Sequence, residues 1–401
     1  MIERSPKVLI VLDNDFAPDI RVDNEIKILQ HAGYEITLLC FAFNSKVYSQ
    51  NEAYTIIRVP IKKSYKNRLF FFASWLPLYT NLWSKHIINE LNNGDFDLIY
   101  AHDLYMIAPV HRSLEKLKSK AKFIIDLHEH FPAAIESYSW TNGFLRRMLS
   151  QPRIWYTREK KDLQHPDLCI TLSDTFSNRL SEIAKRSIDD YYAFPNITPL
   201  KPLVDFNTQL DYNQSDVVFL YYGAIGDRRG IFDLFEAFLE VIEKCPNAKL
   251  LLIGPVDKSD KSKFENYLNN PKIASNVKYI PWIESKYWQN FAEESHFCLA
   301  PFLVNPQHNS GVANKIYQYL QAGKFTIASN CTPQQILLES YDGGIIFKNQ
   351  KEFAQALEKC YFNKETYILK GENAKVKFNQ RDDYQENMNS YLDRIQQLLL
   401  K

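Results

Sequence analysis

Short apolar runs alternate with helix-like segments along this chain, and that alternation limits the folds open to it. Val8 to Leu12 is a continuous apolar run, which is typical of a strand buried in a parallel sheet. Val22, Ile26 and Leu29 then recur at helical spacing, and Gly33 ends that helix. Further strand candidates of the first half stand at residues 36–39, 56–59, 97–100, 123–125 and 168–172. The pattern predicts an α/β fold with a parallel, doubly wound sheet.

A second series of apolar runs begins after a polar stretch that contains proline. The runs stand at residues 217–221, 250–253, 277–280, 297–300, 325–328 and 345–347. We therefore expect one Rossmann-like domain over residues 1–196, a linker over 197–216, a second Rossmann-like domain over 217–375 and a C-terminal helical segment over 376–401. In such domains ligands are expected beyond the carboxyl ends of the strands.

The composition excludes several classes of protein. A chain of 401 residues can bury two separate cores, and 45% hydrophobic with 24% charged residues is ordinary for a globular protein. The net charge of +1 gives no global field that would attract nucleic acid. The six cysteines are scattered without metal-ligand spacing, as in a reducing compartment. The start does not read as a signal peptide and no apolar run is long enough to span a bilayer, so a cytoplasmic location is expected.

One segment of the second half combines a polar loop, a short helix and a strand. Residues 308–311 form the loop, and Asn309 or Ser310 can cap a helix over 312–321. Gly323 ends that helix, and an apolar strand follows. A small-residue loop that leads into a helix start presents free backbone N–H groups and the positive end of the helix dipole. Both suit an anion such as a diphosphate.

Lys315 falls in the first turn of this expected helix. A cation is unfavourable there because it meets the positive end of the dipole, unless a bound anion compensates it. The mismatch indicates an anion-binding site.

The same segment resembles the nucleotide-sugar-binding motif of retaining GT-B glycosyltransferases, in particular glycosyltransferase family 4. That motif has a Glu, seven residues and a second Glu on the helix, followed by a small residue and Gly. Ser310 and Gln318 stand at the two acidic positions, and Asn314-Lys315 resembles a branch of the family that carries Asn-Lys there. In the family the second acid holds the ribose hydroxyls and the first touches the donor sugar. Gln318 can still donate and accept hydrogen bonds, but without charge.

The resemblance also implies the architecture and the donor site. The two parallel sheets are expected to face a central cleft, and the C-terminal helix, with residues 391–400 as the candidate, is expected to cross back to the first domain. Backbone N–H groups of Gly311, Val312 and Ala313 would bind the diphosphate beside Lys315.

A glycine-containing loop, residues 223–230, follows the first strand of the second half and begins at Gly223. Its glycines lack the spacing of a dinucleotide site. The loop resembles the family's second phosphate-binding loop, with Ala224 at the usual Arg position and Arg229 at the usual Lys position. Two adjacent guanidiniums, those of Arg228 and Arg229, suit bidentate phosphate contacts. The alternative is a solvated turn with basic side chains.

The segment around Trp282 and Ile283 resembles the family segment that flanks the nucleotide base. Backbone groups would read the base edge there. Packing of Trp282 into the core explains the aromatic residue equally well.

His128 and Glu129 follow a predicted strand, so their side chains are expected at the carboxyl edge of the sheet. The pair resembles the family's cleft histidine, which contacts the donor sugar or the acceptor. A structural histidine is one alternative and a metal ligand is another. The His128–His130 pair lacks the helical spacing of zinc proteases, and the sequence places no third ligand nearby, so no metal is predicted.

His102 and Asp103 also end a predicted strand and resemble the family's residues at the inner cleft wall. Asp15 and Arg21 flank the loop after the first strand, where family members close over donor and acceptor. We place these four residues, together with Glu129, on the acceptor side. A hydrogen-bonding role at the sheet edge, or a helix cap at Asp19 with a salt bridge, explains them as well.

Two stretches interleave basic and aromatic residues. Residues 62–89 hold five Lys or Arg and no acid among many aromatics, and residues 146–161 are similarly basic. Such stretches suit an interfacial helix on an anionic bilayer. An acceptor groove, or an amphipathic helix on the sheet, would show the same pattern.

These features predict a retaining transfer of sugar from a nucleotide-diphosphate sugar to a glycan or lipid-linked glycan, as in surface polysaccharide synthesis. Lys315, Arg228 and Arg229 would stabilise the departing diphosphate, and His128 would orient the sugar or acceptor. No cofactor or metal is expected, no nucleic acid is expected as a partner, and the protein could lie at the inner face of the membrane. Two alternatives stay open: a GT-B nucleotide-sugar epimerase, and a non-catalytic scaffold that binds nucleotide sugar or glycan.

Overall fold

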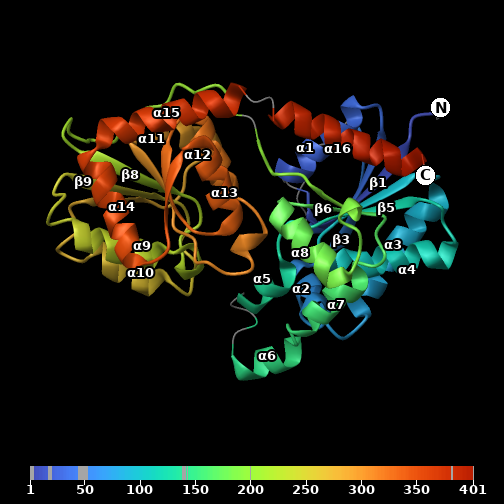
Figure 1. The fold of residues 1–401 in the computed structure, drawn as a ribbon. Coiled ribbons are helices and arrows are strands. Elements are labelled where there is room, and N and C mark those ends of the chain that lie inside the picture. Colours follow the sequence, from blue (N-terminus) through green and yellow to red (C-terminus); the bar gives the residue numbers. More distant parts are fainter. Residues whose placement is uncertain are drawn as a thin grey trace. The chain divides into compact units, whose positions relative to one another are not determined.

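The chain forms two compact α/β units (Figure 1). The computed structural model describes residues 4–16, 20–43, 53–137, 141, 143–198, 200–380 and 383–400. The first unit comprises Met1–Pro195 with Gln385–Lys401, and the second comprises Asn196–Tyr384. Each unit contains one parallel sheet, which confirms the predicted fold class of two Rossmann-like halves.

The first unit is built on a seven-stranded sheet with the order β3-β2-β1-β4-β5-β6-β7. Its strands are β1 (Lys7–Asp15), β2 (Glu35–Phe43), β3 (Thr55–Ile61), β4 (Leu98–His102), β5 (Lys122–Asp126), β6 (Leu168–Thr171) and β7 (Tyr191–Ala193). Every neighbouring pair is parallel. The edge strand β7 was not predicted, because three residues are too short for a periodic pattern.

Helices cover both faces of this sheet. Side chains alternate along β1, so Val8 and Ile10 belong to the core under α1 and α16, while Leu9 and Val11 belong to the core under α3 and α4. The helices are α1 (Ile20–His31), α2 (Lys63–Phe71), α3 (Leu78–Asn93), α4 (Ile107–Leu117), α5 (Phe131–Ser137), α6 (Phe144–Ser150), α7 (Ile154–Asp162), α8 (Asp174–Ala184) and α16 (Asp383–Leu400), with 3₁₀ turns η1 (Leu104–Met106) and η3 (Ile188–Asp190).

The C-terminal helix α16 belongs to the first unit although it follows the whole of the second (Figure 1). Tyr391 is fully buried, its ring stacks on Phe194 with centroids 4.4 Å apart, and its hydroxyl donates to the hydroxyl oxygen of Tyr100 at 3.0 Å. Ile395 lies in the same core cluster. The helical segment expected over residues 376–401 is two helices, because α15 ends at Gln380 before α16 begins.

The second unit has a six-stranded parallel sheet with the order β10-β9-β8-β11-β12-β13. Its strands are β8 (Val217–Tyr222), β9 (Ala248–Ile253), β10 (Val277–Ile280), β11 (Phe297–Ala300), β12 (Phe325–Ser329) and β13 (Gly344–Phe347). Its helices are α9 (Ile231–Val241), α10 (Lys261–Leu268), α11 (Trp288–Glu293), α12 (Asn314–Gln321), α13 (Thr332–Tyr341), α14 (Gln350–Phe362) and α15 (Lys364–Gln380), with 3₁₀ turns η4 (Asp227–Arg229), η5 (Ser285–Tyr287) and η6 (His308–Ser310).

The polar segment over residues 197–216 packs against the second unit. Phe206 stacks on Tyr287 with ring centroids 4.1 Å apart, and Asn290 Nδ2 donates to the carbonyl oxygen of Val204 at 2.7 Å. The described residues of this segment form no helix or strand. Residues 197–216, which were expected to be a linker, are therefore packed against the second unit.

Replacing Tyr391 should test how far α16 stabilises the first unit. We expect Tyr391→Ala to lower the free energy of unfolding of that unit by about 3 kcal/mol, because it empties a fully buried aromatic site. Tyr391→Phe keeps the ring stack and removes only the bond to Tyr100, so it should cost about 1 kcal/mol. Urea denaturation followed by circular dichroism measures both. Equal losses for the two variants would show that ring packing contributes nothing.

Candidate functional site

Each sheet has one point at which the strand order changes direction. It lies between β1 and β4 in the first unit and between β8 and β11 in the second. At such a point the loops leaving the carboxyl ends of the two strands diverge and leave room for a ligand. The candidate residues gather at these ends: Asp15 and His102 end β1 and β4, while Gly223 directly follows β8.

The loop after β8 holds backbone and ammonium groups in close contact. A Cβ placed on Gly223 would lie 2.9 Å from Lys315 Nζ, and a Cβ on Gly254 would lie 2.1 Å from the carbonyl oxygen of Gly223. Both glycines also have positive φ, of 135° and 142°. Only glycine allows the ends of β8 and β9 to approach each other and Lys315 in this way.

Lys315 lies in an aromatic environment. Its Nζ is 3.7 Å from the ring centroid of Tyr221 and 5.2 Å from that of Phe302, and Arg229 lies over the same Phe302 ring at 5.5 Å. In the described part of the chain Lys315 makes no ion pair. Burial, with the added repulsion of the Arg229 guanidinium, holds the pKa of Lys315 well below its ordinary value. An anion bound beside these two cations would relieve both effects.

The helix after β11 begins later than predicted and lacks the predicted cap. Helix α12 starts at Asn314, and its N-cap Ala313 offers no side-chain bond. Asn309 Oδ1 accepts from the backbone N–H of Thr332 at 2.8 Å, and Ser310 Oγ donates to the carbonyl oxygen of Gln307 at 2.6 Å. The capping role assigned to these residues is therefore wrong, because Ser310 bonds within the preceding turn and Asn309 bonds to the first residue of α13. The first turn of α12 is left without a side-chain cap.

The remaining donor-side residues differ in exposure. Ser310 is buried, with 3% of its surface exposed, whereas Gly311, Val312, Ala313 and Gln318 are half-buried. Ile283 is half-buried as well, but Trp282, in the loop after the edge strand β10, is 68% exposed. The alternative that Trp282 packs into the core is therefore wrong.

In the first unit Arg21 is directed into the protein interior. Its Nε and Nη2 donate to Asp126 Oδ2 and Oδ1 at 2.6 and 2.7 Å, and its Nη1 donates to the carbonyl oxygen of Phe194 at 3.0 Å. Only 5% of Arg21 is exposed. Through these contacts Arg21 holds Asp126, the last residue of β5. The buried position of Arg21 therefore does not support the expected contact with a ligand.

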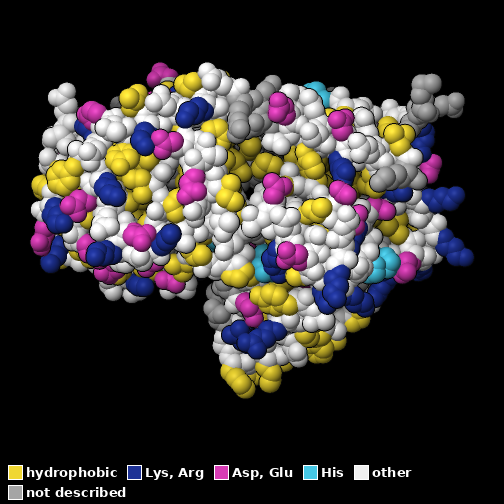
Figure 2. Space-filling view, in the orientation of Figure 1, with side chains coloured by type: hydrophobic (Ala, Val, Ile, Leu, Met, Phe, Trp, Pro, Cys, Tyr) yellow, Lys and Arg dark blue, Asp and Glu magenta, His cyan; other side chains and the backbone are white. Residues whose placement is uncertain are grey.

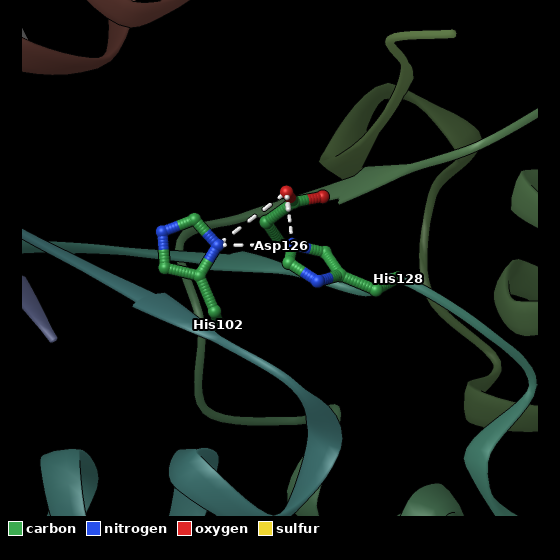
Figure 3. A group of neighbouring side chains, drawn as sticks. All are labelled: His102, Asp126 and His128. Carbon is green, nitrogen blue, oxygen red and sulfur yellow. Dashed lines mark hydrogen bonds and ion pairs between the residues drawn. The ribbon is translucent and has the colours of Figure 1, made fainter. Parts of the chain in front are cut away.

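His128 points its Nε2 at the same carboxylate (Figure 3). His128 Nε2 lies 2.9 Å from Asp126 Oδ2 and 3.1 Å from His102 Nδ1. Because a carboxylate only accepts, His128 Nε2 carries the proton, and the facing His102 Nδ1 is unprotonated. The proton of a neutral His102 is then on Nε2, which lies 3.7 Å from Glu25 Oε2.

Burial and the Arg21 guanidinium, together with the contacts among the three side chains, set the charges of Asp126, His102 and His128. Burial would raise the pKa of Asp126, but the Arg21 guanidinium and the two histidines hold it well below its ordinary value. Burial lowers the pKa of His102. For His128 burial opposes protonation, but the Asp126 carboxylate outweighs it and raises the pKa. The arrangement favours a neutral His102 and a charged His128.

His102, Asp126 and His128 offer three potential metal-ligand atoms that all lie within 4.8 Å of one another. The expectation that no further ligand lies near His128 is therefore wrong, because neighbouring strands β4 and β5 bring these residues together. His130 lies elsewhere, with its Nε2 3.7 Å from Glu159 Oε1. Both oxygens of Asp126 already accept from Arg21, so the carboxylate has its charge balanced by the protein itself.

Asp103 has an unusual backbone conformation. Its φ of 73° and ψ of 145° lie in a region that is costly for a residue with a side chain, by about 1–3 kcal/mol. Its N–H donates to the carbonyl oxygen of Asp126 at 2.8 Å, and its carboxylate accepts from the Tyr105 hydroxyl at 2.9 Å. Burial raises the pKa of Asp103. Strain at a strand end beside polar groups is typical of functional positions.

Besides Asp126, the first unit contains a second buried carboxylate, that of Asp13, which the sequence did not lead us to predict. Asp13 accepts from the Tyr79 hydroxyl and from Trp83 Nε1, the latter at 2.9 Å, and Lys66 Nζ lies 3.0 Å from its other oxygen. Asp15, two residues on, lies 3.5 Å from an Arg58 nitrogen. The available signal was an acid directly after the apolar run of β1. The same signal marks Asp126 at the end of β5.

Comparison with known proteins places this geometry in a family. A model described as Glycosyltransferase Family 4 matches residues 20–189, and one described as Glycosyl transferases group 1 matches residues 216–363. A comparison with curated protein sequences gives no match.

Solved structures show the same fold over nearly the whole chain. Sucrose-phosphate synthase from Thermosynechococcus elongatus aligns with a TM-score of 0.75 at 16% identity, covering 99% of this chain and 100% of that chain. HepE from Anabaena in complex with UDP aligns with a TM-score of 0.68 at 13% identity, covering 98% and 100%. WaaG, a glycosyltransferase involved in lipopolysaccharide biosynthesis, aligns with a TM-score of 0.66 at 14% identity, covering 96% and 98%.

The two Rossmann-like units, each with one parallel sheet, have the GT-B fold. The chain belongs to the glycosyltransferases of the group 1 and family 4 type, which the two family models match in its second and first half.

The charged state of His128 should make stability depend on pH. A pKa raised by folding means that protonated His128 stabilises the native state fully below about pH 6.5, and that this stabilisation is lost as pH rises through the raised value. Each unit of pKa difference is worth about 1.4 kcal/mol. We expect His128→Gln to remove this loss of stability at high pH. Free energies of unfolding from urea denaturation between pH 5.5 and 9 measure it. The exposed His31→Gln variant serves as the control, and parallel pH profiles of wild type and His128→Gln would contradict the assignment.

Proposed function

We propose that the protein transfers a sugar, with retention at the anomeric carbon, from a nucleotide-diphosphate sugar to a glycan or lipid-linked glycan. The observation that carries this proposal is the pair of cations at the switch point of the second unit. Lys315 and Arg229 lie against aromatic rings, and within the described residues no carboxylate pairs with either side chain. A diphosphate would supply the missing negative charge.

The second unit would stabilise the departing diphosphate. Arg228, Arg229 and Lys315 would bind its oxygens, together with the backbone N–H groups at the uncapped start of α12. These fixed positive groups would lower the barrier because charge develops on the diphosphate as the glycosidic bond breaks. The transfer would then need no bound metal ion. Gln318, half-buried one turn further along α12, would hold the ribose hydroxyls.

The first unit would handle the sugar and the acceptor. His128 Nε2 is committed to Asp126, which leaves the opposite nitrogen, Nδ1, as the one to meet a ligand. When His128 is charged, that nitrogen donates a hydrogen bond to a sugar hydroxyl. Asp103, Asp15 and Glu129 stand at the same sheet edge and would bind acceptor hydroxyls. No nucleophile is assigned.

The proposed setting is surface polysaccharide synthesis at the cytoplasmic face of a membrane. No described helix is both long and apolar enough to cross a bilayer. The similar Anabaena structure is a complex with UDP, so uridine diphosphate is the first nucleotide to test.

A non-catalytic nucleotide-sugar scaffold is the second candidate. Ser310 and Gln318 replace the two acids of the family motif, and the Ser310 hydroxyl is used within its own turn. A nucleotide-sugar epimerase is less favoured, because it would use acidic pairs that these positions lack.

Calorimetric titration with UDP, GDP, ADP and CMP should show selective binding of one nucleoside diphosphate. We expect Lys315→Ala to weaken that binding at least tenfold, because it removes a cation beside the phosphates. Lys351→Ala, an exposed lysine on α14, is the matched control and should bind as wild type does. Wild-type affinity in Lys315→Ala would remove the phosphate role.

Binding should also take up protons. The pKa of free Lys315 is well below its ordinary value, and a bound diphosphate would raise it. Affinity should therefore fall as pH rises, and the calorimetric enthalpy should vary with the ionisation enthalpy of the buffer. Lys315→Ala should abolish that variation. An enthalpy in wild type that is the same in all buffers would contradict proton uptake.

A turnover assay distinguishes a transferase from a non-catalytic scaffold. Incubation with the selected nucleotide sugar and a lipid-linked glycan acceptor should release nucleoside diphosphate, and His128→Gln should reduce the rate at least tenfold while donor binding persists. Tight donor binding without release of diphosphate under any acceptor condition would favour the scaffold.

A further inference from the structure

We propose that a surface formed by α2, the turn after it and α6 docks onto an anionic lipid bilayer, with the tip of α6 inserted among the lipids. This surface is called the α2–α6 platform below. This inference deepens the proposed function and rests on it, because docking on a bilayer serves the transfer only if the acceptor is bound to the membrane. Binding to lipid needs no donor sugar, so it is measured independently of transfer.

Helix α6 exposes apolar side chains that nothing in its own unit covers. Phe144 is 86% exposed and Leu145 is 65% exposed, and Met148 and Leu149 are exposed as well. Ser150 is the only buried residue of this seven-residue helix. In the space-filling view hydrophobic side chains gather at the tip where α6 lies, beside a group of Lys and Arg (Figure 2). A cluster of large exposed apolar residues marks an interaction site.

Hydrogen bonds join α6 to the turn after α2. Ser74 Oγ donates to the carbonyl oxygen of Ser150 at 2.6 Å, and Trp75 Nε1 donates to that of Leu149 at 2.9 Å. Trp75 is itself exposed, and α2 has no buried residue. The two helices therefore present one continuous surface, in which the polar atom of Trp75 is satisfied and the exposed part of its ring can meet an apolar phase.

Two cavities with mainly apolar walls open on this platform. One of about 390 Å³ is lined by Asn67, Arg68, Phe70, Phe71 and Phe72. Another of about 510 Å³ is lined by Phe144, Arg147, Met148, Gln151, Pro152, Arg153 and Ile154. Each combines apolar walls with arginine, which suits a molecule that has an acyl chain and an anionic head group.

The charge of the platform is positive. No acidic residue stands between positions 61 and 89 or between 143 and 158. Its exposed cations are Lys62, Lys63, Arg68, Arg146, Arg147 and Arg153. Glu136 lies 3.4 Å from an Arg147 nitrogen and 3.7 Å from an Arg153 nitrogen and offsets one of these charges, while Asp13 pairs with Lys66 of α2. Apolar side chains ringed by cations are typical of segments that lie in the interface of an anionic membrane.

The charge also decides between a bilayer and a second copy of the chain. A twofold dimer through the platform would bring the same cations of both copies face to face. Those charges would repel each other as the apolar tips came together. An anionic bilayer supplies the opposite charge and the apolar phase at once.

Vesicle flotation tests the proposal with the full chain. We expect binding to phosphatidylcholine vesicles that contain about 30% phosphatidylglycerol, because their negative surface potential attracts basic segments, and little binding to phosphatidylcholine alone. Phe144→Ser with Leu145→Ser should weaken binding at least tenfold, and so should Arg146→Gln with Arg147→Gln. Ile336→Ser with Leu369→Ser removes two comparably exposed apolar residues from the second unit and should bind as wild type does.

Fluorescence locates the inserted residue. An environment-sensitive dye on Phe144→Cys should shift to the blue on anionic vesicles and be quenched by nitroxide-labelled lipid, whereas the dye on Ile336→Cys should do neither. The native cysteines are all buried, so labelling is directed to the new thiol. Absence of wild-type binding, or binding that both α6 variants retain, would overturn the proposal. Dimers that dissociate in Phe144→Ser with Leu145→Ser, without vesicle binding, would overturn it in favour of a second copy.

Discussion

A parallel sheet covered by helices on both faces leaves little room for charged side chains along its central strands, and this constraint shapes both units. Residues 8–12 of β1 are almost completely buried, and the first acid, Asp13, comes directly after them. In β4 and β5 the apolar run likewise ends in His102 and Asp126. Polar chemistry is therefore displaced to the carboxyl ends, where the strand order of each sheet also reverses.

The two units treat buried charge in opposite ways. In the first unit Asp126 is paired with Arg21 and the cluster is balanced by the protein itself. Removal of one partner would leave a buried charge unpaired, which costs several times more than the pair contributes. In the second unit Lys315 and Arg229 meet aromatic rings, and the described residues offer them no carboxylate. The first arrangement positions a histidine, while under the proposed function the second would be completed by a bound diphosphate.

Most strands were predictable from the sequence because they are runs of mainly apolar residues bounded by polar ones, whereas the three-residue strand β7 was not. The runs at 277–280 and 297–300 coincide with β10 and β11. The cap of α12 was predicted wrongly, because Asn309 bonds to Thr332, which lies 23 residues further on, instead of its own helix. The pairing of Arg21 with Asp126 spans 105 residues and leaves no local pattern. Local periodicity thus predicts elements, while the contacts that define the site depend on how the sheet brings distant strand ends together.

The position of α16 has a consequence for biosynthesis. Tyr391 completes the core of the first unit beside Tyr100, which precedes it by 291 residues. When the ribosome has made every strand of the first sheet, the core on one face of that sheet still lacks its last helix. The second unit, whose residues all precede Gln385, can fold before that helix emerges. The first half of the chain must therefore wait, with apolar surface uncovered, until α16 has been translated, and during that time it depends on protection from aggregation.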